Sequence, residues 1–161
     1  MILRSFTPVD IDELLRITGN PEVSRYIPNL IQDRETLISW VKDMSATDHE
    51  YMILQEGQVI GECSLDENGG EIGIMLYPEY WHQGYGTAAV KELMKIAESL
   101  GMDEVSAQTD RKNAACIGLL ESLGFIRCGI GWAFSSEDPE KPLDELQQIF
   151  VYRKRLNKEA D

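Results

Sequence analysis

The feature that most constrains this fold is a change in the spacing of apolar residues along the chain. Residues 51–55, 59–65 and 71–77 alternate between apolar and polar side chains, which is typical of strands with one buried face. Residues 56–58 indicate a hairpin turn between the first two of these strands, and residues 66–70 break the pattern before the third. From Gly84 the spacing becomes helical until Gly101. We therefore expect an antiparallel meander followed by a helix.

The rest of the chain interleaves strands and helices in the same way. Strands are predicted over residues 2–6, 105–109, 125–130 and 148–153. Helices are predicted from Pro8 to a stop at residues 19–21, over residues 22–26, after an N-cap at Asp33, and over residues 113–123. A polar stretch at residues 135–145 precedes the last strand, and no internal repeat is found. This order predicts one domain over residues 1–161, of α+β (mixed α/β) class.

The net charge of the chain limits which classes of molecule it is expected to bind. The 161 residues carry 28 acidic against 15 basic side chains, a formal charge of −13. Such a surface repels a phosphate backbone, so we expect no nucleic-acid partner. No apolar run approaches the ~20 residues that a membrane span needs, so we expect no membrane partner.

Cysteine and histidine usage points to a reduced compartment without a structural metal. Cys63, Cys116 and Cys128 are odd in number, widely spaced and never in a C-x-x-C pair. We therefore expect free thiols and a cytoplasmic location. The two histidines, His49 and His82, lie in unrelated contexts, so we expect no metal site.

A glycine-rich loop carries the clearest chemical signal. After the strand that ends near Leu76, a short loop leads to Gly84 and Gly86, which open an amphipathic helix. Free N–H groups at a helix N-terminus, with the helix dipole behind them, attract anions, and glycine lets a phosphate come close. The loop therefore predicts a diphosphate-binding site, although a loop that only starts a helix has the same pattern.

Gly84-x-Gly86-x-x-Ala89 also fits the dinucleotide fingerprint, with Asp110 as a ribose partner. The fingerprint should follow its strand directly, yet eight residues separate Met75 from Gly84. An antiparallel meander also stands where a dinucleotide fold has its first parallel unit. A nucleotide-dependent oxidoreductase is therefore the least favoured hypothesis.

A second informative segment begins at Asn113. This residue is placed to cap the next helix by accepting a hydrogen bond from the N–H of Cys116. Leu119, Leu120 and Leu123 give the helix a buried face, and the glycine that follows allows a left-handed exit into a strand. Alone, the segment predicts only a well-capped helix.

Together the two segments resemble the GNAT superfamily of acetyl-coenzyme A-dependent N-acetyltransferases, most closely the Rim-type (ribosomal-protein alanine) N-acetyltransferases. The resemblance spans nearly the whole chain, and its most specific parts are Glu71-Ile72-Gly73 with Pro78-x-x-Trp81-x-x-Gly84-x-Gly86, and Asn113-x-x-Cys116 running into Leu123-Gly124-Phe125. It implies the GNAT acyl-CoA N-acyltransferase fold, a central, mostly antiparallel, twisted sheet of about seven strands with helices on both faces.

The resemblance also implies where acetyl-coenzyme A, the co-substrate, binds. The acetyl and pantetheine arm pairs with the strand backbone at Ile74, Met75 and Leu76. The pyrophosphate loop corresponds to His82, Gln83, Gly84, Tyr85, Gly86 and Thr87, and Asn113 contacts the cofactor arm. Many relatives have Arg or Gln where this chain has Trp81, so one polar contact is expected to be missing.

The catalytic acid and base depart from the Rim-type pattern. Those enzymes use a Glu and a Tyr at the positions that hold Gln108 and Leu120 here. Other members place a Ser acid where Cys116 lies, and a thiol with a pKa near ~8.5 can protonate a departing thiolate. The competing interpretation of Cys116 is a small buried apolar residue.

Glu71 is the first candidate for the base, because some relatives carry a catalytic Glu on this strand that works through water. The competing interpretation is an exposed carboxylate at the start of a strand. Glu62, on the neighbouring strand, is an alternative base. Bulk water can also take the proton when the enzyme acts mainly by positioning its substrates.

The expected reaction is direct transfer of the acetyl group to a primary amine, on a small molecule or a protein N-terminus. The overall acidity and the carboxylates at residues 137, 138, 140, 144 and 145 favour a cationic acceptor, although a solvated loop has the same composition. A homodimer is common among such proteins. The alternative function is a catalytically silent acyl-CoA-binding module, which the replacements at Gln108 and Leu120 favour.

Overall fold

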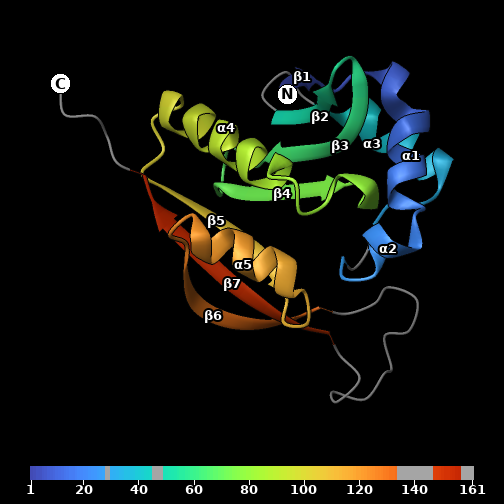
Figure 1. Cartoon of the computed structure of the whole chain (residues 1–161). Helices are drawn as coiled ribbons and strands as arrows, with labels where there is room; N and C mark the ends of the chain where they lie inside the picture. The colour runs from blue at the N-terminus through green and yellow to red at the C-terminus, as the bar shows by residue number, and fades with distance from the viewer. Residues whose placement is uncertain (28–29, 45–48, 134–146, 157–161) are drawn as a thin grey trace.

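A computed structural model of the chain describes residues 1–27, 30–44, 49–133 and 147–156. It contains a seven-stranded sheet in the order β1-β2-β3-β4-β5-β7-β6 (Figure 1). The strands are β1 (Ile2–Ser5), β2 (His49–Gln55), β3 (Gln58–Leu65), β4 (Glu71–Leu76), β5 (Glu104–Asp110), β6 (Ile126–Ala133) and β7 (Gln147–Arg155). The helices are α1 (Ile11–Thr18), α2 (Pro21–Ser24), α3 (Arg34–Asp43), α4 (Tyr85–Ser99) and α5 (Ala114–Ser122), with short 3₁₀ turns η1 (Pro8–Asp10) and η2 (Pro78–Tyr80).

The predicted meander is confirmed. β2, β3 and β4 pair antiparallel in sequence order. The turn between β2 and β3 places Glu56 and Gly57 at φ values of 51° and 82°, as a tight primed hairpin turn requires. Most predicted elements shift by one to three residues at their ends, and the helix expected over residues 22–26 is the short α2. The polar stretch at residues 135–145 lies outside the described residues.

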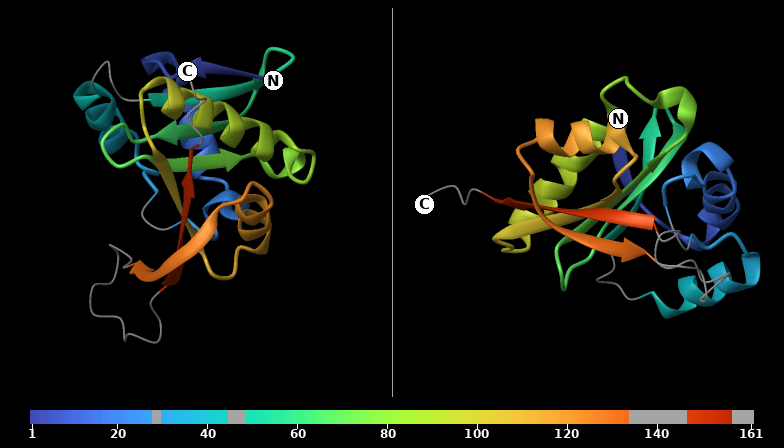
Figure 2. Two further views of the ribbon diagram at one scale, coloured as in Figure 1. Left: turned by 90° about the vertical axis from the view of Figure 1, so that its left-hand side faces the viewer. Right: turned by 90° about the horizontal axis from the view of Figure 1, so that it is seen from below.

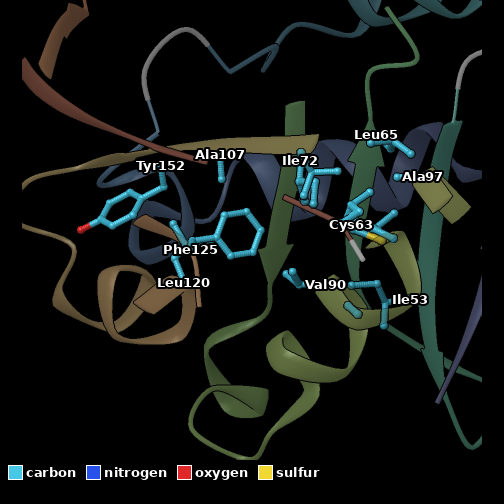
Figure 3. Close-up of a cluster of buried hydrophobic side chains, with 14 of the residues drawn as sticks. Ile53, Cys63, Leu65, Ile72, Val90, Ala97, Ala107, Leu120, Phe125 and Tyr152 are labelled. Atoms are coloured by element: carbon cyan, nitrogen blue, oxygen red, sulfur yellow. The ribbon is translucent and has the colours of Figure 1, made fainter. Parts of the chain in front are cut away.

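Helices cover both faces of the sheet, as the resemblance implied. On one face, α4 and α5 pack over a cluster that includes Ile53, Cys63 and Ile72. Figure 3 shows this cluster running from Tyr152 and Phe125, on the α5 side, to the strands under α4. On the other face, α1, α2 and α3 pack over a second cluster. That cluster receives the strand residue Met52, which is fully buried.

The sheet divides between β4 and β5. These strands are parallel and share two register pairs, Glu71 with Ser106 and Ile72 with Ala107. Beyond Ile72 the strands separate, so that β5, β7 and β6 run steeply across the direction of β1 to β4 (Figure 2). Every other neighbouring pair in the sheet is antiparallel. The sheet therefore has one opening, beside the second half of β4. No helix in the described part of the chain has the length and apolar character to cross a membrane.

Candidate active site

The opening between β4 and β5 exposes backbone hydrogen-bonding groups. In the β3–β4 ladder, the N–H of Tyr77 donates to Ile60 and the carbonyl of Glu71 accepts from Asp66. Because hydrogen-bonded pairs alternate along an antiparallel ladder, Gly73 and Met75 also bond to β3. Ile74 and Leu76 therefore turn their N–H and C=O groups toward β5, where the ladder has already ended. Of the three strand residues expected to meet the acyl arm, these two face the opening with their backbones.

Trp81 occupies one of these backbone groups. Its indole N–H donates to the carbonyl oxygen of Leu76 at 2.8 Å, and its ring packs against the second cluster. Where many relatives have Arg or Gln, this chain therefore uses its side chain to fix the end of β4. The N–H of Leu76 and both backbone groups of Ile74 still face the opening.

The predicted pyrophosphate loop leads from η2 to the N-terminus of α4. His82 and Gly84 both have positive φ, 56° and 85°, and Gly84 is the N-cap of the 15-residue helix. Ala88 is the first residue whose N–H bonds back to Gly84. The N–H groups of Tyr85, Gly86 and Thr87 therefore lack partners within the helix. An added side-chain carbon at Gly84 would meet no atom within 4 Å, so the space beside this N-cap residue is open.

Gly86 has a packing role in addition to the phosphate-binding role that its motif predicts. A Cβ there would lie 2.7 Å from Cδ1 of Leu119 on α5, and close to side chains of β4. The residue is buried where α4 and α5 approach each other. Its missing side chain therefore allows the two helices to pack closely, whereas Gly84 supplies the left-handed turn.

Asn113 lies on the other side of the opening, where β5 leads into α5. Its side-chain oxygen accepts a hydrogen bond from the N–H of Cys116 at 3.1 Å, which confirms the predicted cap. The amide nitrogen of this side chain remains a potential donor for a ligand. Both helices that flank the opening thus present their N-terminal ends.

Cys116 is half-buried against the first cluster, near Thr109 of β5. Burial raises the pKa of its thiol, and a hydrogen bond with Thr109 opposes that rise. The raised pKa keeps a proton on the sulfur at neutral pH, so the side chain has a proton to transfer, but the same rise makes the thiol a weaker acid.

Glu71 lies on the opposite face of the sheet, at the start of β4. Its carboxylate accepts a hydrogen bond from Nε2 of Gln108 at 3.0 Å. Gln108 stands where the Rim-type enzymes carry their base, and here it holds the Glu71 carboxylate beside the point where the strands separate. Leu120, at the position of the Rim-type acid, is 3% exposed and part of the core. The candidate acid and base therefore approach the opening from opposite faces.

A cavity of about 460 Å³ lies on the same face as Glu71, between the ends of β2, β3 and β4 and helix α3. Its lining includes Trp40, Glu50, Ser64, Asp66, Glu71 and Gly73. Beside it, Glu62 is 6% exposed. Burial, a hydrogen bond with Glu50 and the charge on Glu50 raise the pKa of Glu62 well above its ordinary value of 4.5.

The sequence pointed to Glu62 as an alternative base but not to its pairing with Glu50. The predicted strand began at residue 51, whereas β2 begins at His49. With β2 extended to residue 49, strand alternation places Glu50 and Glu62 on one face of the hairpin. The one signal in the sequence for a buried carboxyl was Glu62 itself, an acidic residue among the mostly apolar residues 59–65.

A second unexpected contact fixes the end of β4. The phenol O–H of Tyr77 donates to Oε1 of Glu13 on α1 at 2.6 Å. Burial and this carboxylate raise the pKa of the phenol, which stays protonated at neutral pH. The contact ties α1 to the strand that borders the opening.

Among the residues that the structure describes, no three His, Cys, Asp or Glu side chains lie together in a way that could hold a metal ion. The chemistry available here comes from helix N-termini, strand backbone, one thiol and several carboxyls.

Comparison with known proteins agrees with this geometry. The family model for the acetyltransferase (GNAT) domain matches residues 1–126. Among curated proteins, the uncharacterized N-acetyltransferase p20 of Bacillus licheniformis is 28% identical over 167 residues, covering 94% of this chain and 90% of that protein.

Solved structures share the fold at lower identity. A ribosomal-protein-alanine N-acetyltransferase from Brucella melitensis superposes with a TM-score of 0.77 at 21% identity, covering 97% of this chain and 100% of that one. The structure of yncA from Salmonella typhimurium with its cofactor acetyl-CoA gives a TM-score of 0.75 at 18% identity, covering 100% and 96%. At these identities the likeness establishes a common fold.

Proposed function

Since the chain belongs to the GNAT family of acetyltransferases, we propose that it transfers the acetyl group of acetyl-coenzyme A directly to a primary amine. Family membership makes it an acetyl-coenzyme A-dependent acetyltransferase, and the acceptor and the residue roles are the proposal. The observation that carries it is the opening between β4 and β5. There, exposed strand backbone meets two helix N-termini, a combination that suits an amide-bearing arm ending in phosphates.

The anionic end of the cofactor binds at the start of α4. The N–H groups of Tyr85, Gly86 and Thr87 donate to phosphate oxygens, and the helix dipole adds a favourable field. The open space at Gly84 admits the phosphates. These local donors outweigh the unfavourable net charge of −13 because they act at contact distance, whereas dispersed surface charges are screened.

The acyl arm lies along β4. The backbone groups of Ile74 and the N–H of Leu76 pair with its amides as a further strand would. A strand N–H in this stretch stabilises the negative charge that develops on the carbonyl oxygen during attack. Met75 contributes its side chain on the face of the sheet that α1, α2 and α3 cover, and Asn113 donates from the far side of the opening.

Proton transfer uses both faces of the sheet. The amine attacks the thioester carbonyl, so a carbon–nitrogen bond forms while the carbon–sulfur bond breaks. Glu71, held by Gln108, accepts the amine proton through water. Cys116 gives its proton to the departing thiolate, and solvent restores it. This arrangement replaces the Glu and Tyr of the Rim-type enzymes.

The test is thiol release from acetyl-coenzyme A over a panel of amines and N-terminal peptides, with the acetylated product identified by mass. Cys116→Ala and Glu71→Gln are each expected to lower kcat by ~10²–10⁴-fold, the usual range for a general acid or base. Cys128→Ala and Glu56→Gln change the same residue types on the exposed surface and should leave the rate within about twofold of the unchanged protein.

Two outcomes would contradict the proposal in different ways. Binding of acetyl-coenzyme A without turnover of any amine favours a catalytically silent acyl-CoA-binding module. Turnover that Cys116→Ala and Glu71→Gln both leave unchanged shows that positioning and bulk water suffice. The cytoplasmic location and the homodimer expected from the sequence stay predictions.

A further inference from the structure

The lining of the cavity beside Glu71 includes Gly73, which has no side chain to fill the space. Glu50, Ser64 and Gly73 are register partners across β2, β3 and β4, so they share one face of the sheet. A Cβ at Gly73 would lie 2.8 Å from Oγ of Ser64. The absence of a side chain at Gly73 therefore preserves a hollow at the β4 end of the row, next to Ser64.

This cavity adjoins the place of acyl transfer. Two of its lining residues, Glu71 and Gly73, flank Ile72, the last residue of β4 that pairs with β5. From Gly73 the row runs across two strand spacings of ~4.8 Å each to Glu50, about 10 Å away. A molecule in the cavity can thus reach the opening with one end and Glu50 with the other.

The lining is acidic at both ends. Glu71 stands at the end near the opening, and Glu50 stands at the far end with Glu62 hydrogen-bonded to it. Trp40 adds an indole to the wall, and aromatic rings attract organic cations. Within the described residues, no lysine or arginine lines the cavity. The described carboxyls are not grouped to hold a metal ion, so the lining fits an organic cation better.

The Glu50–Glu62 pair explains how the far end of the cavity would recognise a cation. Glu62 is more than nine-tenths buried, and its carboxyl shares a hydrogen bond with another carboxyl. A buried carboxyl beside a second, partly buried one does not ionise at small cost, so Glu62 holds a proton next to Glu50 in the free protein. A ligand cation beside Glu50 can take the place of that proton.

We propose that this cavity is the acceptor pocket, and that its acceptor is a primary amine with a second cationic group held at the Glu50–Glu62 pair. The inference rests on the proposed acetyl transfer and narrows its substrate class. The reacting amine lies at Glu71, beside the opening. The second cation lies two strands away, where it displaces the shared proton to solvent.

Proton release is the signature of this arrangement. Other ionisable groups also border the cavity, and they are Glu71 on β4, Asp66 and Glu67 in the turn after β3, and His49 on β2. α3 contributes Trp40 to the lining and none of its charged residues. Because burial and the contact with Glu50 raise the pKa of Glu62, we expect the proton lost on cation binding to come from this pair, and the Glu62→Gln variant tests that source.

The experiment is calorimetric titration of the protein–coenzyme A complex, near pH ~6, with 1,5-diaminopentane and with the matched monoamine 1-aminopentane. Each titration is repeated in two buffers of different ionisation enthalpy, which gives the number of protons released. The diamine should bind ~10-fold tighter or more, as a charge-assisted hydrogen bond of ~1.5–3 kcal/mol implies. It should release up to about one proton, and the monoamine none.

Variants of Glu50 and Glu62 test whether the tighter binding of the diamine and its proton release come from these two carboxyls. Glu62→Gln should abolish proton release by the diamine, and Glu50→Gln should bring the two amines to within about twofold in Kd. Glu56→Gln, in the exposed turn between β2 and β3, removes the same charge and should change neither result.

Three results would overturn the proposal. They are equal affinity for the two amines in the unchanged protein, proton release that survives Glu62→Gln, and failure of the complex to bind either amine. Each is distinguishable from failure of acetyl transfer, because binding of coenzyme A is measured first and thiol release with other amines is scored separately.

Discussion

Replacement of Glu62 by glutamine tests the pairing of this buried carboxyl with Glu50 through stability alone, without any ligand. Gln has nearly the same shape, and its amide N–H can replace the acid O–H as a donor to Glu50. The substitution therefore removes the titration of this site while keeping its packing. Glu62 is 6% exposed, so solvent does little to moderate the effect.

The magnitude follows from proton linkage. Burial, the hydrogen bond with Glu50 and the charge on Glu50 raise the pKa of Glu62 above 4.5 in the folded chain. Between the ordinary pKa and the folded one, the folded chain binds a proton that the unfolded chain lacks. Its free energy of unfolding then falls by about 1.4 kcal/mol per pH unit from this group, and Glu62→Gln abolishes that slope.

The assay is urea unfolding of the unchanged protein and of Glu62→Gln from pH ~4 to ~8. Their difference in free energy of unfolding should be small at the acidic end and should grow in favour of the variant as pH rises, by up to about 1.4 kcal/mol per unit. Glu56→Gln should track the unchanged protein. A variant less stable near neutral pH, or a difference independent of pH, would refute the protonated state of Glu62 beside Glu50.

Three further substitutions test other parts of the account. Gly84→Ala places a side chain at a φ of 85°, so it should cost ~1–2 kcal/mol in urea unfolding and weaken acetyl-coenzyme A binding in calorimetry; unchanged affinity would contradict the phosphate site. Asn113→Ala removes a helix cap and should cost ~0.5–2 kcal/mol, with no loss if the cap were unimportant. Arg4→Met breaks the pair with Asp10, whose pKa is lowered because hydrogen bonds from Arg4 and Thr7 and the charge of Arg4 outweigh burial. The cost, about 1–3 kcal/mol near pH ~7, should shrink as the pH falls below 3.8 and the carboxyl protonates; a cost that persists in acid would show packing instead.

Local signals in the sequence predicted local structure well. Asp33 and Asn113 cap α3 and α5 as expected, because an N-cap depends on a side chain and an N–H only three residues apart. The hairpin turn at Glu56 and Gly57 and the stop at Gly101 are equally local. The meander, the order of the elements and the glycine-led helix all follow from such patterns.

Features that depend on distant residues were not predictable in the same way. A side chain at Gly86 would collide with Leu119, which is remote in sequence. The hydrogen bond from Trp81 to the carbonyl of Leu76 likewise depends on how the chain turns after β4. The Glu50–Glu62 pair depends on register and on where β2 begins. Gln108 departs from the Rim-type pattern, yet its contact with Glu71 becomes visible only when β4 and β5 lie side by side.

The most direct test of the acyl site is amide hydrogen exchange along β4, followed by NMR with and without acetyl-coenzyme A. The register leaves the N–H groups of Ile74 and Leu76 facing the opening, while those of Gly73 and Met75 are bonded to β3. Bound acetyl-coenzyme A should therefore protect Ile74 and Leu76 strongly and change Gly73 and Met75 little. Binding that leaves Ile74 and Leu76 unprotected, or protects all four residues equally, would contradict the placement of the acyl arm and the mechanism built on it.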